Sequence, residues 1–278
     1  MISNKGSRTP TPAVNRGRIM HDTAYEIGRH FFEIYGAAGQ IIIELGSYNV
    51  NGSLRDFCPA GATYLGLDVE LGPGVDIRVE PGRDLPLRDD FADIVVSTSA
   101  FEHDPAFWDT FLQFARVLKP GGVLYLNAPS NGMFHRYPID CWRFYPDCGK
   151  GFVALAQKRG YPLTLVESFI AERRGEHWND FVAVFKKSSA DAWPARFLSD
   201  TVPCKNIVRL GVEGIGAPSE LPEDMRILEA LRGENAELKA ALEAAEFRAL
   251  EAQLRARLAE KEETIAQLSA RLAESVPS

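Results

Sequence analysis

The sequence predicts a doubly wound α/β domain with a mostly parallel sheet, followed by a long C-terminal helix. Over the first two thirds of the chain, short β-branched runs bounded by glycine alternate with amphipathic helical segments. Prolines and glycines interrupt this pattern over residues 188–222. From residue 223 onward the chain is rich in alanine, leucine, glutamate and arginine, with apolar residues at heptad spacing. We therefore expect one globular domain, a linker and a coiled coil.

The predicted elements follow in chain order. Asp22 is placed to cap a first helix that ends at Gly36 and presents a broad apolar face. Further helices are expected at residues 105–118 and 151–160, where aromatic residues recur at helical spacing in the first case. Strands are expected at residues 41–45, 63–68, 93–97, 122–127, 163–169 and 180–185. The globular part should end near residue 187.

Composition excludes several function classes. The 278-residue chain is 45% hydrophobic, enough to bury one substantial core, and its formal net charge is −7. The acidic balance argues against a nucleic-acid partner, because phosphate neutralisation needs a basic surface. The four cysteines have no C-x-x-C spacing, which argues against a zinc site or a disulfide framework. No run is apolar and long enough to cross a bilayer. We therefore expect a cytoplasmic protein in which residues 1–20 are disordered.

A turn after the first strand is the most informative motif. The apolar run 41–45 contains Glu44 and is followed by Gly46, which lets the backbone turn tightly beside a ligand. The next strand ends at Asp68, where a strand-turn-helix-strand unit places an acid against ribose hydroxyls. Tyr48 occupies the middle glycine position of G-x-G-x-x-G, and no phosphate-loop motif occurs. A ribose-containing ligand without a pyrophosphate is therefore predicted.

Four motifs in order resemble the class I S-adenosylmethionine-dependent methyltransferases. They are the acid-x-glycine turn, the segment 86–97, in which Pro86-Leu87 resembles the family's L-P-F element and residues 91–97 its F-D-x-V-x-S strand, the Glu102-His103 pair, and the L-K-P-G-G turn at 118–122. The resemblance covers roughly residues 22–187. It implies a Rossmann-like seven-stranded sheet closed by an antiparallel hairpin, and methyl transfer from S-adenosylmethionine. It also implies a methyltransferase domain at 21–187, a linker at 188–222 and a coiled coil at 223–275.

The resemblance assigns a cofactor site. The methionine end of S-adenosylmethionine is expected to lie beside Glu44, Gly46 and Ser47. The ribose is expected to contact Asp68. The rest of the cleft is expected to be lined by Gly82, Asp84 and Ser99. Pro81-Gly82 replaces the D-A dipeptide that many relatives carry near the adenine, so Glu80 or Asp84 is the alternative acid. Ser99 occupies the position at which some relatives have a metal-binding glutamate, and we therefore expect no metal.

The segment 127–147 after the fifth predicted strand is the expected acceptor loop. It mixes aromatic and charged residues at the carboxyl edge of the sheet, where open α/β folds bind ligands. This composition suits a sugar, a surface glycan or another small polyhydroxylated acceptor, with rings stacking on Tyr137, Trp142 or Phe144. A packed structural loop is the alternative.

Two histidines compete for the role of general base. His135 is the first candidate, because an imidazole with a near-neutral pKa can take a hydroxyl proton. His103 is the rival, since it follows the fourth predicted strand near the expected methyl donor. Asp140 and Tyr137 are second-rank catalytic partners.

The C-terminal segment carries a coiled-coil pattern. Apolar residues follow 3-4-3-4 spacing from Leu228 to Leu242 and resume it at Ile265, with one stutter between. At 1.5 Å per residue the segment spans roughly 75 Å. Asn235 at a core position favours a parallel homo-oligomer, and a solvated single helix is the alternative.

Two readings of the whole chain remain. A methyltransferase followed by a coiled coil resembles bacterial enzymes that methylate the end of a surface polysaccharide and use the rod to sense chain length. Those relatives often carry a kinase domain between the two parts, where this chain has only the linker. The alternative is a non-catalytic Rossmann-like scaffold protein that is recruited through its coiled coil.

Overall fold

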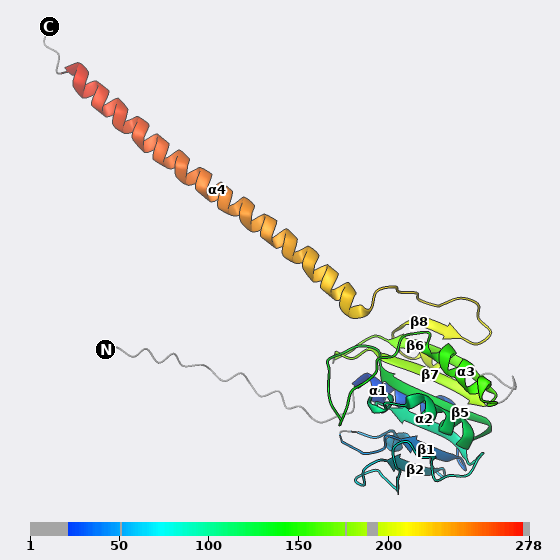
Figure 1. Ribbon diagram of the computed structural model, residues 1–278. Helices are drawn as coiled ribbons and strands as arrows, with labels where there is room; N and C mark the ends of the chain where they lie inside the picture. The colour runs from blue at the N-terminus through cyan, green and yellow to red at the C-terminus, as the bar shows by residue number, and fades with distance from the viewer. Residues whose placement is uncertain (1–21, 51, 176, 188–193, 275–278) are drawn as a thin grey trace, which may run out of the picture. The chain divides into compact units, whose positions relative to one another are not determined.

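The computed structural model describes residues 22–50, 52–175, 177–187 and 194–274. The chain separates into two compact units, Met1–Ser219 and Glu220–Ser278. The first unit is an α/β domain, and the second contains one long helix (Figure 1). In the part of the chain that is described, no helix is both long and apolar enough to cross a membrane.

The α/β domain is built on one mixed sheet of eight strands in the order β3-β2-β1-β4-β5-β7-β6-β8. Strands β1 to β5 pair in parallel with their neighbours, whereas β7 is antiparallel to β5 and β6, and β8 is antiparallel to β6. The strands are β1 (Ile41–Leu45), β2 (Thr63–Asp68), β3 (Ile77–Arg78), β4 (Ala92–Thr98), β5 (Leu118–Pro129), β6 (Leu163–Ala171), β7 (Asp180–Lys187) and β8 (Cys204–Arg209). The Rossmann-like architecture agrees with the prediction, but the expected seven strands are eight.

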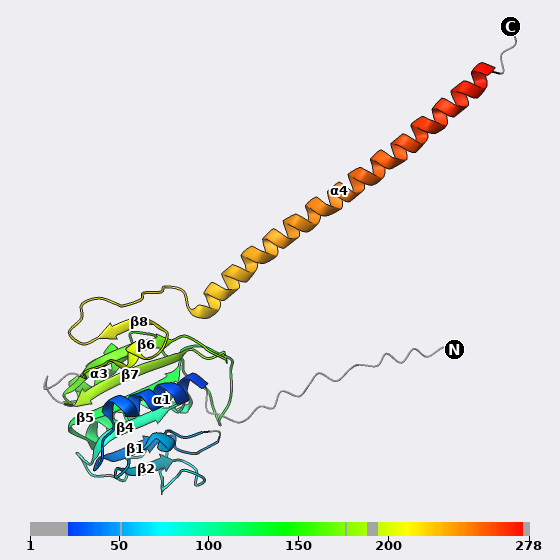
Figure 2. The same ribbon diagram turned by 180° about the vertical axis from the view of Figure 1, so that it is seen from behind.

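Helices cover both faces of the sheet, so the core has two halves. Helix α1 (Asp22–Tyr35) packs on one face, where Phe31 is fully buried and its ring lies 4.7 Å from that of Tyr125 (Figure 2). Helices α2 (Phe107–Val117) and α3 (Cys148–Lys158) cover the other face (Figure 1). Apolar residues in the central strands point to both faces, because a doubly covered sheet buries both of its sides.

The connection from β1 to β2 is shorter than expected. Its described residues, 46–50 and 52–62, form no full helix; they contain the 3₁₀ turn η1 (Leu54–Phe57), which Ser53 caps by accepting a hydrogen bond from Arg55 N at 3.1 Å. Leu54 is fully buried against α1, where a Cβ on Gly28 would lie 2.1 Å from its Cδ2. Pro59 follows η1 almost directly, and proline cannot continue a helical hydrogen-bond ladder.

The eighth strand lies in the range that the sequence assigned to a linker. β8 pairs with β6, and the preceding turn η3 (Leu198–Asp200) is fixed by a buried carboxylate. Glu167 accepts hydrogen bonds from Leu198 N at 2.7 Å, from Ser199 N at 2.9 Å and from Ser199 Oγ at 2.6 Å. Prolines and glycines bound this short run on both sides, which is why the range was interpreted as a linker.

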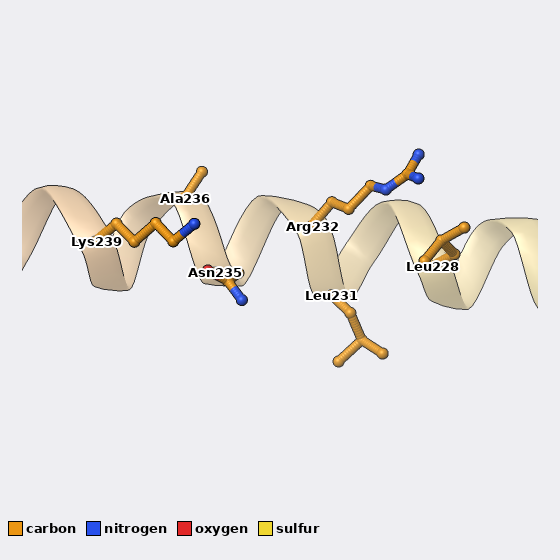
Figure 3. A pocket seen from close by; sticks show the side chains of 6 residues that line it. All are labelled: Leu228, Leu231, Arg232, Asn235, Ala236 and Lys239. Carbon is orange, nitrogen blue, oxygen red and sulfur yellow. The ribbon is translucent and has the colours of Figure 1, made fainter.

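The second unit contains α4 (Glu223–Glu274), a helix of 52 residues. Its leucines are exposed, with exposed fractions of 56% for Leu231, 64% for Leu238 and 60% for Leu242. Figure 3 shows a surface on this helix that is lined by Leu228, Leu231, Arg232, Asn235, Ala236 and Lys239. All six residues belong to α4, so this surface is a helix face and not an enclosed cavity. The predicted coiled coil requires a second helix, and we return to it as a proposal.

Candidate active site

Buried polar atoms without partners gather at the carboxyl edge of the parallel strands. Glu44 and Ser47 lie at the end of β1, and the register pairs Leu45 with Ser97 and Thr98 with Asn127. Among the described residues, five such atoms at this edge have no hydrogen-bond partner: Glu44 Oε2, Ser47 Oγ, Thr98 Oγ1, Glu102 Oε2 and Asn127 Oδ1. Unpaired buried polar groups cost free energy and are rare in folded proteins, so a group of them marks a place for a ligand.

Glu44 is the most strongly perturbed of these groups on β1. Its side chain is almost fully buried, and burial raises the pKa of this carboxyl to about 7, although the neighbouring Tyr64 hydroxyl and, to a smaller extent, the positive charge of Arg55 oppose the shift. The carboxyl is therefore only partly ionised near neutral pH. A positively charged group on a bound ligand would favour its ionised form.

The turn after β1 is held tightly to its neighbours. Gly46 adopts φ +87°, and a Cβ there would lie 2.7 Å from Cβ of Ala100. The amides of Gly46 and Ser47 both donate to Leu67 O, at 3.0 and 3.2 Å. The sequence prediction that glycine is required here therefore has a steric basis, in addition to the turn itself.

Asp68 ends β2 beside this turn. Its Oδ2 accepts a hydrogen bond from Tyr48 N at 3.0 Å, and its Oδ1 accepts one from Glu70 N at 3.2 Å. Each carboxylate oxygen has more than one lone pair, so these two bonds orient the group and leave acceptor capacity for ligand hydroxyls. The half-buried carboxylate fits the predicted contact with a ribose.

The remaining predicted cofactor residues lie in two different settings. Ser99 adopts φ +50°, a conformation uncommon for serine, and its amide donates to Asn127 O at 3.0 Å, next to the unpartnered polar atoms. Gly82 and Asp84 lie instead on an exposed turn, where Asp84 accepts a hydrogen bond from Gln113 Nε2 at 2.8 Å. The structure thus places Ser99 at the edge described above and leaves Gly82 and Asp84 on the surface.

The loop after β5 is organised around Asp140. Arg143 donates to both carboxylate oxygens, at 2.6 and 2.9 Å, and His135 N donates to Oδ2 at 2.8 Å. Arg143 holds the pKa of Asp140 at about 2, and the side chain is only 2% exposed. His135 Nδ1 lies 3.3 Å from Asp140 Oδ2. Asp140 is therefore a charged group that orients His135, and its low pKa makes it a poor proton acceptor.

The two competing histidines meet in space. The rings of His103 and His135 are 4.9 Å apart and nearly perpendicular. His103 Nδ1 forms a hydrogen bond with Ile139 O, and burial lowers the pKa of His103, which favours its neutral form. Glu102 lies directly beside them, because its Oε1 is 3.7 Å from His103 Nε2. Burial raises the pKa of Glu102 to about 8.

The sequence motifs alone did not identify Glu102, Thr98 or Asn127 as candidate site residues. Glu102 was visible in the Glu102-His103 motif, but its burial and its contact with His103 depend on the fold. Thr98 ends β4 and pairs with Asn127 near the end of β5, and this position at the edge of the parallel strands is the signal that would have identified both residues.

Aromatic side chains surround the histidines, but not all of those predicted. Tyr137 is 62% exposed with its ring 6.5 Å from that of His103, and Trp142 is 36% exposed. Trp178, from the turn before β7, packs against His135 at 5.0 Å. Phe144 is only 2% exposed and packs in the core beside Phe152. The predicted stacking role of Phe144 is therefore wrong, because its ring is already covered by other aromatics.

Comparisons with known proteins point to one family. Residues 53–126 match a family model described as a methyltransferase domain. An uncharacterised methyltransferase of Mycobacterium leprae (strain TN) is 30% identical over 141 residues, covering 46% of this chain and 52% of that protein. One from Mycobacterium ulcerans (strain Agy99) is also 30% identical over 141 residues, covering 46% and 54%. The chain thus spans about half the length of the curated relatives it matches.

Two of the solved structures to which the chain is similar are the following methyltransferases. One is 1,6-didemethyltoxoflavin-N1-methyltransferase of Burkholderia thailandensis, with bound 1,6-didemethyltoxoflavin and S-adenosylhomocysteine. It is 13% identical with a TM-score of 0.47, covering 61% of this chain and 80% of that one. The other is a SAM-dependent methyltransferase from Archaeoglobus fulgidus, 12% identical with a TM-score of 0.46, covering 62% and 96%. The match of residues 53–126 to a methyltransferase-domain model supports the resemblance to class I S-adenosylmethionine-dependent methyltransferases that the sequence motifs indicate.

Proposed function

We propose that the chain transfers a methyl group from S-adenosylmethionine to an oxygen of a sugar, a surface glycan or another small polyhydroxylated acceptor. The observation that carries the proposal is the group of unpartnered buried polar atoms at the carboxyl edge of β1, β4 and β5. A bound ligand would supply the hydrogen-bond partners that the protein withholds from these atoms.

The residues at the ends of β1 and β2 fit the cofactor. When bound, S-adenosylmethionine supplies a methyl group that its sulfonium charge already activates. Asp68 is oriented by two backbone amides to bind ribose hydroxyls, and Glu44 offers a buried carboxyl to the positively charged end. Gly46 keeps the turn free of a side chain. The protein's contribution is therefore mainly positioning.

The acceptor side is the group of polar residues around the two histidines. In the proposed reaction His103 or His135 accepts the proton of an acceptor hydroxyl, and Asp140 orients His135. Tyr137 and Trp142 offer partly exposed rings on which a sugar face can stack. Arg143 is committed to Asp140, so it acts by positioning the loop.

We also propose that α4 joins two copies of the chain in a parallel coiled coil. Its leucines are exposed at heptad spacing and Asn235 occupies a core position. With Asn235 at position a, Glu234 falls at position g and Lys239 at the following e position. These two positions face each other across a parallel dimer and carry opposite charges.

Calorimetry with S-adenosylmethionine tests the proposed cofactor site. We expect micromolar binding to the full chain and at least a tenfold loss in Asp68→Ala, because the ribose contact is removed. Asp109→Ala, an exposed residue of α2, is the matched control and should bind normally. Absence of binding at millimolar cofactor would reject the enzyme and favour the scaffold reading. A radiolabelled methyl-transfer screen over sugars and lipid-linked glycans then tests the acceptor class.

A further inference from the structure

We propose that Glu102, His103 and His135 form a binding site for one divalent transition-metal ion. Each residue offers a ligand atom, and these atoms all lie within 4.8 Å of one another. Glu102 and His103 belong to the turn η2 (Phe101–His103) after β4, whereas His135 belongs to the loop after β5. The fold therefore brings together a carboxylate and two imidazoles from segments that are distant in the sequence.

Glu102 gives independent support for a cation. Its side chain is 1% exposed, and within the described part of the chain its Oε2 has no hydrogen-bond partner. A buried carboxylate oxygen without a partner is costly, and buried carboxylates are normally paired or coordinate metals. A cation between Glu102 and the two histidines would supply the missing interaction.

The two imidazoles are oriented as metal ligands are. His103 Nδ1 forms a hydrogen bond with Ile139 O. His135 Nδ1 lies 3.3 Å from both Asp140 Oδ2 and Met133 O. A histidine that donates Nδ1–H to a carbonyl or carboxylate keeps its lone pair on Nε2, and this is the usual arrangement around bound metals. These partners thus assign Nε2 of each histidine as the coordinating atom.

The donor set selects the kind of ion. Two imidazole nitrogens and one carboxylate oxygen suit Zn²⁺, Mn²⁺, Fe²⁺ or Co²⁺, whereas Mg²⁺ and Ca²⁺ prefer oxygen ligands throughout. Ligand atoms at about 2.1 Å from a tetrahedral Zn²⁺ lie roughly 3.4 Å apart, so the most distant pair of ligand atoms needs to approach by up to about 1.4 Å. The proposed site departs from the expectation of no metal, which rested on Ser99 standing where some relatives carry a glutamate, because His135 offers a third ligand atom in its place.

The use of this ion rests on the proposed methyl transfer, whereas its binding does not. Three protein ligands leave a coordination position for an acceptor hydroxyl, whose pKa the ion would lower. The hydroxyl proton passes to water, the new O–CH₃ bond forms as the S–CH₃ bond breaks, and S-adenosylhomocysteine leaves with the sulfur electron pair. The bound ion would thus replace His135 as the group that activates the hydroxyl: with the metal in place His135 is a ligand, and the base role proposed above applies to the metal-free protein only.

The test is metal binding by the full, tag-free chain after removal of metals with a chelator. We expect equilibrium dialysis with Zn²⁺ to show one equivalent bound, and Co²⁺ to give the absorption bands of a nitrogen- and oxygen-ligated ion. Glu102→Gln and His135→Ala should each weaken Zn²⁺ binding at least tenfold. His177→Ala removes an exposed histidine outside the trio and should leave binding unchanged.

Circular dichroism establishes that each variant is folded. If the wild-type chain binds no Zn²⁺, or if Glu102→Gln and His135→Ala bind it as tightly as His177→Ala does, the metal site is refuted. S-adenosylmethionine binding is measured on the same metal-free samples. Cofactor binding without metal binding rejects only the metal site, whereas metal binding without cofactor binding rejects the proposed function and leaves the metal site standing.

Discussion

At the residue scale, the burial of Glu44 makes the stability of the folded chain depend on pH. The pKa of its carboxyl is about 7 in the folded chain and 4.5 in a model peptide, because burial disfavours the charged form. A raised folded-state pKa means that the stability contributed by this group is fully present below pH 4.5 and is lost as the pH rises to about 7. One pKa unit corresponds to about 1.4 kcal/mol, so the loss amounts to about 3 kcal/mol.

We predict that Glu44→Gln abolishes this loss of stability, because the glutamine side chain does not ionise. The free energy of unfolding of the wild-type chain should fall relative to that of the variant between pH 4.5 and 7. Urea unfolding of both proteins at several pH values measures the difference. Parallel stability curves for the two proteins would contradict the assigned pKa. Asp109→Ala, which changes an exposed carboxylate, should run parallel to the wild type.

At the scale of elements, the buried carboxylate of Glu167 fixes η3 against the sheet next to β8. Glu167 receives three hydrogen bonds from Leu198 and Ser199, and burial raises its pKa. An amide in its place has only one acceptor oxygen and points an NH₂ donor at other donors. We therefore predict that Glu167→Gln lowers the free energy of unfolding by about 2 kcal/mol.

Denaturant unfolding measures this loss, and hydrogen exchange should show that β8 becomes less protected. Glu70→Gln is the control, because Glu70 is exposed and follows β2, a strand near the other end of the sheet from β8. Equal effects of the two substitutions would show that the buried hydrogen bonds do not hold η3.

Sequence patterns predicted the elements with long apolar runs and the acids that follow them. Glu44 and Asp68 were located because each sits at the end of a recognisable strand, and strand ends define the ligand edge. β8 was missed, since Pro203 and nearby glycines hide a six-residue strand. The approach of His103 to His135 was also out of reach, because packing decides it. The stacking role predicted for Phe144 was wrong, because composition does not show which aromatic side chains are buried in the core.

At the scale of the whole molecule, the roles of the two units can be tested separately. Residues up to Ser219 form one compact unit, and α4 lies in the other. We predict that a chain ending at residue 219 is a folded monomer that still binds S-adenosylmethionine, whereas the full chain is a dimer. Light scattering gives the mass of each species. A truncated chain that remains dimeric would refute the role of α4.

A pair of substitutions in α4 refines that experiment. Leu238→Glu places a charge at a core position and should dissociate the dimer. Glu243→Lys alters an exposed position outside the a/d seam and should leave the mass unchanged.

The segment that follows β8 folds back and pairs with it, which affects whether the edge of the sheet can bind a strand of another molecule. Ile207 exchanges two backbone hydrogen bonds with Gly216, at 2.8 and 2.7 Å, and Asn206 N donates to Ala217 O at 3.0 Å. These bonds occupy amide and carbonyl groups that an outer strand would otherwise offer to a neighbouring molecule. The opposite border strand, β3, has only two residues. Both margins are thus poor templates for intermolecular strand addition, which protects the domain against fibre-like aggregation.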